Sequence, residues 1–516
     1  MDDDAAMHPG DLLRRRGGRI AIVMAGSGAS RTYAELDDRS TRLARAFDEA
    51  GLVPGDHVAV LLHNGLEYLD AVWAALRSGL YVTPVSWHLG PAETGYILED
   101  CGARALVTSA AMADVVGELG SAAAGLDVRL SVGGGIDGYD DLDDVLAQLP
   151  GTPRTDEREG QLMLYSSGTT GRPKGILPPL PRSPFGAAKG GITPVAEHLY
   201  GMDETSTYLS TAPMYHAAPL GWTIAAHRLG STVVVMERFD AAAALDAIER
   251  HAVTHAQFVP THFIRMLRLP EEVRAAADLS SLRKVIHAAA PCPEPVKQQM
   301  IDWVGPIVDE YYGGSEGFGF CNITADEWLA HRGSVGRSVL GPIHVVDEDG
   351  TELGPGETGQ VWFEAAGRFE YHGDPDKTRR ATDPRGWATY GDVGHVDEDG
   401  YLYLTDRVSN MIISGGVNIY PQEAENVLAA HPAVHDVAVL GVPDAEMGER
   451  VKAFVVAVHP PADPAGLAAE LIEHCRAELA HYKCPRELAF VDELPRLESG
   501  KLLKRRLLEQ AGAATA

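Results

Sequence analysis

The chain is predicted to be an α/β protein whose large N-terminal part contains doubly wound sheets and a small β-lobe. Over residues 31–260, short apolar runs alternate with segments whose apolar residues recur at three- and four-residue steps. This alternation predicts parallel sheets that helices cover on both faces. The later apolar runs at 359–364 and 400–405 are short, punctuated by glycine and proline, and lack intervening helices. They predict the β-lobe.

The elements of the N-terminal part are expected in a regular order. Residues 31–36 are typical of a strand end that feeds a helix, which continues through Leu43, Ala44 and Phe47 until Gly51 ends it. After this helix we expect strand 58–62, helix 68–76, strand 81–85, strand 103–108, strand 206–212, strand 231–236, helix 241–249 and strand 256–260.

The composition restricts the class of protein. With 516 residues, 45% of them hydrophobic and 23% charged, the chain is long enough for a large core and more than one domain. The 44 Lys and Arg residues against 73 Asp and Glu residues give a net charge of −29, so no nucleic-acid partner is expected. No apolar run approaches membrane-spanning length and the N-terminus lacks the order of a secretory signal, which favours a cytoplasmic protein without a membrane span. The widely spaced cysteines are expected to be buried free thiols: Cys101, Cys292, Cys321, Cys475 and Cys484.

Residues 166–175, SSGTTGRPKG, combine hydroxyl groups, glycines and two cations in a form suited to a polyphosphate. The apolar run 162–165 before them predicts a buried strand, so the loop is expected to leave a strand end. The stretch does not match the Walker A pattern, because Lys174 follows Gly171 by three positions and precedes Gly175. A polar surface loop is the alternative interpretation of such a segment.

Two short patterns match other classes of protein. Residues 133–138 satisfy G-x-G-x-x-G, but aspartates crowd the place where a pyrophosphate would lie, so a surface turn is expected instead. Residues 313–317 satisfy G-x-S-x-G, the pattern of a serine esterase with Ser315 as the nucleophile. An esterase needs a histidine after Ser315, and the sequence offers several, but this interpretation leaves the 166–175 loop without a role.

The whole string 166–175 resembles the signature of the adenylate-forming superfamily, which includes acyl-CoA synthetases, coumarate-CoA ligases, luciferases and peptide-synthetase adenylation domains. Three other segments agree with it. Residues 311–317 resemble its tyrosine-glycine-x-threonine-glutamate motif with Ser315 in place of threonine, residues 389–392 resemble its aspartate motif, and residues 495–502 resemble its catalytic-lysine loop. The resemblance covers residues 32–507 and points to the acyl-CoA ligase branch.

The resemblance implies that ATP, Mg²⁺ and coenzyme A are used, and it implies a role for each matching residue. Tyr312 would lie against adenine, Glu316 would bind Mg²⁺, and Asp392 would hold both ribose hydroxyls. Lys501 would bridge the substrate carboxylate and the α-phosphate during displacement. The implied catalytic residues are Lys501, Glu316 and His216, and the implied nucleotide-binding residues are Ser166, Ser167, Gly168, Thr169, Thr170, Lys174, Ala290, Tyr312, Ser315, Asp392 and Arg407.

Residues 213–216 and 288–291 resemble the two segments that line the acid pocket in this superfamily. Peptide-synthetase domains place an aspartate in the first segment to pair with an amino group. Here Tyr215 and His216 occupy it, so amino acids are disfavoured as substrates. The implied function is ATP-dependent activation of a hydrophobic, non-amino carboxylic acid to acyl-AMP and then to acyl-CoA.

The family joins a large N-terminal domain to a mobile C-terminal lid. The resemblance therefore implies an adenylation core at residues 1–408 and a smaller α+β lid at residues 409–516 that carries the catalytic lysine. Residues 414–421 resemble the lid's glycine loop and favour the CoA step. Ser409 stands where relatives usually have Asp or Lys, so adenylation alone, with acyl transfer by another protein, is an alternative. A nucleotide-binding scaffold without turnover and a homodimeric assembly also stay open, and the proline-rich run 176–181 departs from the family pattern.

Overall fold

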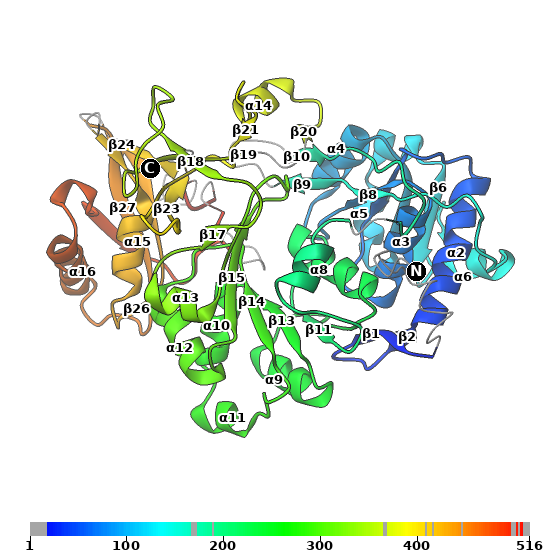
Figure 1. Cartoon of the computed structure of the whole chain (residues 1–516), viewed down its shortest axis with the longest axis horizontal. Coiled ribbons are helices and arrows are strands. Elements are labelled where there is room, and N and C mark those ends of the chain that lie inside the picture. Colours follow the sequence, from blue (N-terminus) through cyan, green and yellow to red (C-terminus); the bar gives the residue numbers. More distant parts are fainter. Residues whose placement is uncertain are drawn as a thin grey trace.

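The structure is a computed structural model of the whole chain. It describes residues 18–166, 173–187, 190–364, 369–407, 410–414, 417–444, 447–496, 502–503 and 506–508, with the backbone alone at Ser166 and Asn418. Figure 1 shows the N-terminal sheet at the right, a central sheet in the lower middle and the smaller C-terminal domain at the left. The predicted α/β class, with doubly wound sheets, a β-lobe and a smaller C-terminal domain, is confirmed.

The N-terminal sheet contains six strands in the order β7-β6-β5-β3-β4-β8, and every neighbouring pair is parallel. Helix α2 (Tyr33–Glu49) begins after Thr32, whose hydroxyl accepts from the Glu35 N–H while the Glu35 carboxylate accepts from the Thr32 N–H. This helix packs against α3 (Leu66–Arg77), as the apolar spacing predicts. The remaining elements are β3 (His57–Val60), β4 (Tyr81–Pro84), α4 (Pro91–Cys101), β5 (Ala103–Ser109), α5 (Ala113–Gly117), β6 (Val128–Val132), β7 (Asp140–Asp141), α6 (Leu142–Gln148) and β8 (Gln161–Leu162).

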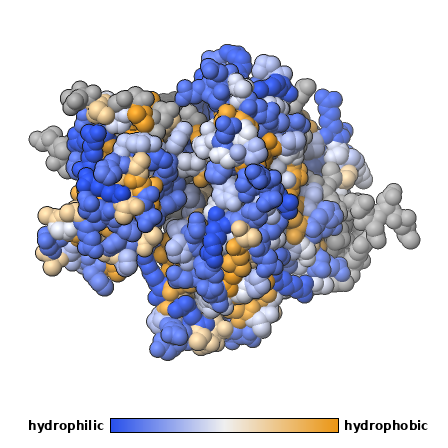
Figure 2. Space-filling model, turned by 60° about the vertical axis from the view of Figure 1, so that its left-hand side comes forward, coloured by the Kyte–Doolittle hydropathy of each residue, from blue (hydrophilic) through white to orange (hydrophobic). Residues whose placement is uncertain are grey.

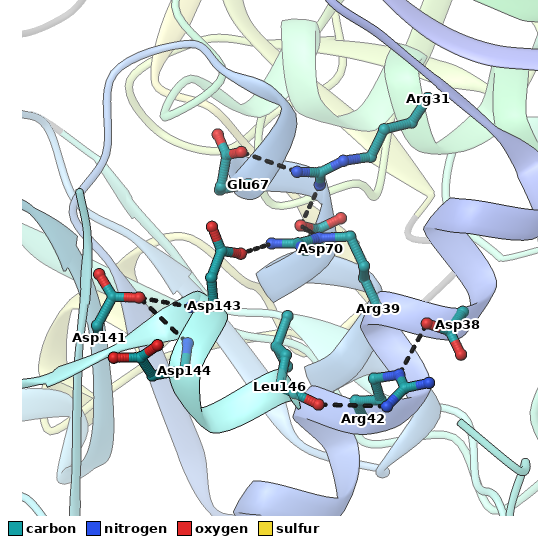
Figure 3. A network of polar contacts seen from close by, with 10 residues as sticks. All are labelled: Arg31, Asp38, Arg39, Arg42, Glu67, Asp70, Asp141, Asp143, Asp144 and Leu146. Atoms are coloured by element: carbon teal, nitrogen blue, oxygen red, sulfur yellow. Dashed lines mark hydrogen bonds and ion pairs between the residues drawn. The ribbon is translucent and has the colours of Figure 1, made fainter. Parts of the chain in front are cut away.

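A network of ion pairs joins three of these helices (Figure 3). The fully buried Asp70 carboxylate of α3 accepts from Arg31 and, at 2.7 Å, from Nε of Arg39 of α2. Arg39 also pairs with Asp143 of α6 at 2.7 Å. Asp141 caps α6 by accepting from two backbone N–H groups of its first turn. Because a buried carboxylate is stable only with such partners, Asp70 fixes α2 against α3.

The central sheet contains nine strands in the order β17-β16-β15-β14-β13-β11-β12-β1-β2. The strands from β15 to β1 in this order are parallel, whereas β2, β16 and β17 pair antiparallel at the edges. Parallel strands bring the segments that follow them to one edge of the sheet. The strands are β1 (Ile20–Met24), β2 (Ser30–Thr32), β11 (Thr207–Ser210), β12 (Thr232–Val235), β13 (His255–Phe258), β14 (Lys284–His287), β15 (Val308–Gly313), β16 (Phe320–Ile323) and β17 (Arg337–Ser338). The helices are α7 (Thr193–His198), α8 (Ala217–Arg228), α9 (Ala241–Arg250), α10 (Pro260–Leu267), α11 (Glu271–Ala276), α12 (Glu294–Val304) and α13 (Ala325–Ala330).

The expected β-lobe is a five-stranded antiparallel sheet. It consists of β18 (Ile343–Val346), β19 (Gly359–Glu364), β21 (Trp387–Ala388), β22 (Asp392–Val396) and β23 (Leu402–Arg407). A separate three-stranded sheet lies between this lobe and the N-terminal sheet in Figure 1, and it consists of β9 (Leu164–Ser166), β10 (Lys174–Leu177) and β20 (Glu370–Tyr371). Helix α14 (Pro375–Arg380) follows β20.

The C-terminal domain has a sheet and a hydrophobic core of its own. The sheet has the order β25-β24-β27-β26, and β28 pairs in parallel with β27. Its core includes Leu428, Val439, Val455 and Leu471, all fully buried. The elements are β24 (Ile412–Ser414), β25 (Val417–Ile419), α15 (Pro421–Ala429), β26 (Val434–Asp444), β27 (Gly448–Ala457), α16 (Pro464–Glu478) and β28 (Glu487–Phe490).

Two expectations need correction. The run 162–165 is not one strand, because β8 pairs with β4 and β9 pairs with β10, and the chain changes partner at the buried Met163. Of the cysteines, four are buried free thiols as expected, but Cys292 is only half-buried. Residues 133–138 form the expected surface turn.

The outer surface is mainly polar. On the face drawn in Figure 2 hydrophilic residues predominate, and apolar residues gather only in small separate patches. Among the described residues, no helix combines the length and the apolar character needed to cross a bilayer.

Candidate active site

The strands on either side of the 166–175 loop form an antiparallel pair. Ser166 at the end of β9 lies opposite Lys174 at the start of β10, so the loop leaves a strand end as expected. Ser167, Gly168, Thr169 and Thr170 lie outside the described residues, and so does the Ser166 side chain. The Lys174 ammonium lies 3.3 Å from the Asp374 carboxylate that precedes α14.

The proline-rich continuation of this loop runs beside the N-terminal sheet. The Tyr81 hydroxyl of β4 donates to the Pro178 carbonyl at 2.9 Å, and Pro184 forms a backbone bridge with Arg158. Because proline has no N–H to donate, a segment with several prolines can border a sheet only through carbonyl groups and isolated bridges. This arrangement gives the segment a structural place beside β4.

Residues 314–317 form the turn that joins β15 to β16. The Gly317 N–H donates to the Gly314 carbonyl at 3.1 Å, and Gly317 has a positive φ of 73°, which glycine adopts without strain. Ser315 is exposed at the tip of the turn. A nucleophile elbow requires a strand, a sharp turn and then a helix, whereas the chain here returns as an antiparallel strand. The esterase interpretation of Ser315 is therefore not favoured.

The Glu316 carboxylate has a defined position above this turn. The Tyr371 hydroxyl donates to its Oε1 at 2.6 Å. Its Oε2 lies over Gly314, where a Cβ atom would come within 2.6 Å of that oxygen and within 2.3 Å of the Tyr390 ring. Gly314 therefore leaves space for the carboxylate, and Tyr371 fixes its orientation.

Asp392 accepts hydrogen bonds from two residues that come from different strands. The Tyr312 hydroxyl of β15 donates to Oδ2, and Nε of Arg407 donates to Oδ1 at 2.9 Å. Arg407 is also the backbone partner of Asp392 in the β22–β23 pair. The Asp392 side chain is only 7% exposed, and its charge raises the pKa of Arg407. Burial, and then the same carboxylate, raises the pKa of the Tyr312 phenol.

The Glu316 carboxylate and the Asp392 carboxylate with its two partners belong to one site. The Tyr312 and Tyr390 rings meet edge to face with centroids 5.8 Å apart, and Tyr390 also borders the Gly314 turn below Glu316. The structure thus brings Tyr312, Glu316, Asp392 and Arg407 together, as the motifs predict. No sequence motif points to Tyr371, whereas Tyr390 stands within the 389–392 segment.

His216 is the N-cap residue of α8, and it lies against the Tyr215 ring with centroids 4.3 Å apart. The segment before it is held by Asn64, whose side chain accepts from the Met214 N–H at 2.8 Å and donates to the Met236 carbonyl at 2.9 Å. The 213–216 segment therefore has a fixed conformation at the start of α8.

Ala290 follows β14 and is half-buried. Its neighbour Ala289 has a φ of 78°, a left-handed conformation that is unfavourable for a residue with a side chain. Ala288 is buried, and its φ is not positive. The strain in this segment therefore lies at Ala289, and strained backbone of this kind clusters at binding sites.

Lys501 and Ser409 lie outside the described residues. The chain on either side of the lysine segment is described: Arg496 and Leu502 form an antiparallel bridge, and the Leu503 N–H donates to the Pro495 carbonyl at 2.7 Å. Arg496 also binds Asp436 of β26 through two hydrogen bonds of 2.7 and 2.8 Å. The base of the segment is therefore anchored to the C-terminal domain.

The residues present fit a magnesium nucleotide. Within the described ranges no group of three or more His, Cys, Asp or Glu side chains is arranged to hold a metal ion by itself. Mg²⁺ in nucleotide enzymes is usually bound through one or two carboxylates together with the phosphates. Glu316, a single oriented carboxylate next to the phosphate loop strands, satisfies that requirement.

Comparison with protein families gives two matches. The model of the AMP-binding enzyme family matches residues 11–370, and the model of the AMP-binding enzyme C-terminal domain matches residues 423–501. The chain therefore belongs to the AMP-binding enzymes, in the acyl-CoA ligase branch of the adenylate-forming superfamily.

Individual relatives agree with this assignment. The chain is 35% identical over 503 residues to a feruloyl-CoA synthase of an Amycolatopsis species, with 96% of each chain covered. It is 33% identical over 489 residues to the fatty acid–[acyl-carrier-protein] ligase ScoC of Streptomyces coeruleorubidus, which covers 94% of this chain and 92% of that protein. The structure of ATP-bound MatB from Rhodopseudomonas palustris superposes with a TM-score of 0.82 at 26% identity and covers 98% of this chain and 99% of that chain.

The protein is thus an AMP-forming acid–thiol ligase. It activates a carboxylic acid with ATP in the presence of Mg²⁺ to give acyl-AMP and pyrophosphate, and it transfers the acyl group to coenzyme A.

Proposed function

We propose that the substrate is a hydrophobic carboxylic acid without an amino group. The support comes from the rings at the start of α8. Trp87 packs edge to face against Tyr215 with centroids 6.3 Å apart, and His88 does the same at 6.4 Å. Neither segment that resembles the acid pocket, 213–216 or 288–291, contains a carboxylate that could pair with an ammonium group. An aromatic and apolar lining favours an acid of the same character.

We propose that the nucleotide binds along the edge where Tyr312, Asp392 and Arg407 meet. The carboxylate of Asp392 accepts without needing a donor of its own, which suits two adjacent ribose hydroxyls. The Tyr312 ring is held by its hydrogen bond to Asp392 and supplies a face for the adenine. The constellation of Tyr312, Asp392 and Arg407 is the single observation that carries this assignment. Ser315 and Lys174, with the loop between β9 and β10, are assigned to the phosphates.

Lys501 is proposed to neutralise the charge that develops between the substrate carboxylate and the α-phosphate. The carboxylate oxygen attacks the α-phosphorus, the bond to the bridging oxygen breaks, and pyrophosphate leaves with the electron pair. Electrostatic stabilisation of this displacement needs a cation and no covalent enzyme intermediate. Mg²⁺, when bound, supplies charge neutralisation at the phosphates, and Glu316 is the residue that would hold it.

The domains are proposed to be an adenylation core at 1–408 and a mobile lid at 409–516. The separate sheet and separate core of the C-terminal domain support this division. Rotation of the lid would bring the 414–421 loop to the site for the CoA step, with Ser409 as the hinge residue.

The protein is proposed to work in the cytoplasm, where ATP and coenzyme A are available and its cysteines stay reduced. The proposed homodimer is tested by light scattering of the purified protein.

The test is acid-dependent exchange of pyrophosphate into ATP, measured over a panel of aromatic, aliphatic and amino acids, followed by an assay of coenzyme A consumption. Exchange with aromatic or aliphatic acids is expected, whereas amino acids should give none. Lys501→Ala should abolish exchange, and the neighbouring Lys504→Ala serves as the matched control. Undiminished exchange in Lys501→Ala would refute the lysine assignment. Exchange without thioester formation would identify adenylation alone, and Ser409→Asp would then be the first variant to assay.

A further inference from the structure

Tyr371 lies where the strand after the phosphate loop meets the Glu316 turn. It belongs to β20, and its backbone is the antiparallel partner of Ile176 in β10. The next N–H along, that of His372, donates to the Gly175 carbonyl at 2.8 Å. Tyr371 is 6% exposed, and its hydroxyl donates to Glu316 at 2.6 Å. One residue thus connects the strand that begins at Lys174 with the carboxylate assigned to Mg²⁺.

Lys377 lies over the Tyr371 ring. Its ammonium is 3.7 Å from the centroid of the Tyr371 ring. The backbone that carries it is fixed, because its N–H donates to Asp374 at 3.0 Å and the Tyr371 N–H donates to Thr378 at 3.0 Å. A lysine side chain has four rotatable carbons and ordinarily extends into water. Here it folds inward over an aromatic face instead.

The charged groups around Lys377 also favour an anion near this residue. Burial lowers the pKa of its ammonium group, and the charges of Glu316 and Asp374 oppose this effect. Lys174 and Arg380 lie close enough to lower the pKa further. Three cations therefore gather beside two carboxylates, in a chain whose net charge is −29. A surplus of positive charge at this place suits a polyanion, and the preceding loop already has a phosphate-binding composition.

We propose that Lys377 is a further phosphate-binding residue, contacting the β- and γ-phosphates of Mg·ATP, and that Tyr371 positions both Lys377 and the Glu316 carboxylate. This inference rests on the proposed nucleotide site. Lys377 needs only to turn its ammonium from the ring toward the phosphates, while Tyr371 keeps one oxygen of Glu316 occupied and leaves the other for the metal ion. The alternative is that Lys377 serves only to cover Tyr371 and balance Glu316.

The test measures ligand binding without turnover. Isothermal titration with Mg·ATP, with Mg·pyrophosphate and with AMP, in the absence of any acid, is carried out on Lys377→Met, Lys377→Arg and Arg379→Met. Arg379 is the matched control, since it lies on the same helix but is 73% exposed and pairs with Asp376. Lys377→Met should weaken Mg·ATP and Mg·pyrophosphate about tenfold or more, because it removes a charge-assisted contact, and should leave AMP within about twofold. Lys377→Arg should bind all three ligands within about threefold of the wild type, and Arg379→Met should match the wild type.

Equal affinity of Lys377→Met and the wild type for Mg·ATP would overturn the assignment, and so would an equal loss for AMP, which has no β- or γ-phosphate. If Lys377→Met does not fold, Lys377→Gln is titrated in its place with the same expected outcome.

Tyr371→Phe keeps the ring under Lys377 and removes only the hydrogen bond to Glu316. The variant should need about three- to tenfold more free Mg²⁺ for half-maximal ATP binding, with AMP binding unchanged. An unchanged Mg²⁺ requirement would overturn the positioning role. Failure of these binding predictions in a protein that still shows acid-dependent exchange overturns this inference alone, whereas the absence of such exchange in the wild type would overturn the proposed function.

Discussion

Replacement of Asp392 by asparagine tests the nucleotide site most directly. Asparagine has nearly the same shape and can still accept from Tyr312 or Arg407, but it carries no charge and offers a single acceptor oxygen. The side chain is 7% exposed, so the proposed hydrogen bonds to ribose would form largely away from water. We therefore expect the variant to fold and to lose affinity for ribose.

The size of the effect follows from the contacts. A hydrogen bond to a charged group contributes about 1.5–3 kcal/mol, so each ribose hydroxyl on Asp392 is worth roughly one to two powers of ten in affinity. Part of the loss in the variant is offset, because the single amide oxygen of asparagine can still accept from one ribose hydroxyl. For Asp392→Asn we expect the Kd of ATP to rise by about 10- to 100-fold.

The assay compares ATP with its 2′-deoxy and 3′-deoxy analogues in a thermodynamic cycle. The wild type should bind each analogue about tenfold or more weakly than ATP, whereas Asp392→Asn should bind ATP and the analogues almost equally, because the interaction is already lost. Asp399→Asn, an exposed aspartate in the next turn of the lobe, is the control and should behave as the wild type. If Asp392→Asn still discriminates against the deoxy analogues as the wild type does, Asp392 does not hold the ribose.

Three further predictions concern stability and the rival chemistry. Burial lowers the pKa of His227 to about 4, so on acidification the unfolded chain takes up the proton before the folded protein does. The free energy of unfolding should therefore fall by roughly 3 kcal/mol between about pH 6.5 and pH 4. Urea titrations of His227→Gln should lack this part of the loss. Lys297→Met should destabilise the fold by about 3–5 kcal/mol, because it leaves the buried Glu310 carboxylate, 2.6 Å from the lysine ammonium, without its cation. In urea titrations the double variant Lys297→Met, Glu310→Gln should recover most of the lost free energy of unfolding. Equal losses in the single and the double variant would contradict the explanation. Ser315→Ala should raise the ATP concentration needed for half-maximal exchange by about three- to tenfold, because it removes a phosphate contact, without abolishing exchange at saturating ATP. Loss of an ATP-independent ester hydrolysis in this variant would instead favour the esterase.

Local patterns were enough for most of the fold. The apolar spacing of α2 and α3 is a property of short segments, so the prediction of these two helices is confirmed within a few residues. The prediction failed at 162–165, where a single apolar run serves two sheets. The composition of that run is the same whether its partner is β4 or β10, so nothing local reveals the change.

For the candidate site, the sequence determined which segments carry the chemistry, because loops that bind a nucleotide need particular residue types at fixed spacing. The 311–317 and 389–392 motifs predict Tyr312, Glu316 and Asp392 as site residues, and the structure brings all three together. Only the tertiary structure decided what holds them. Tyr371 is 55 residues from Glu316 and stands in no recognisable motif, yet its hydroxyl orients that carboxylate. The reason is physical: the contact exists because β20 pairs with β10, and strand pairing depends on the packing of the whole chain rather than on the residues beside Tyr371.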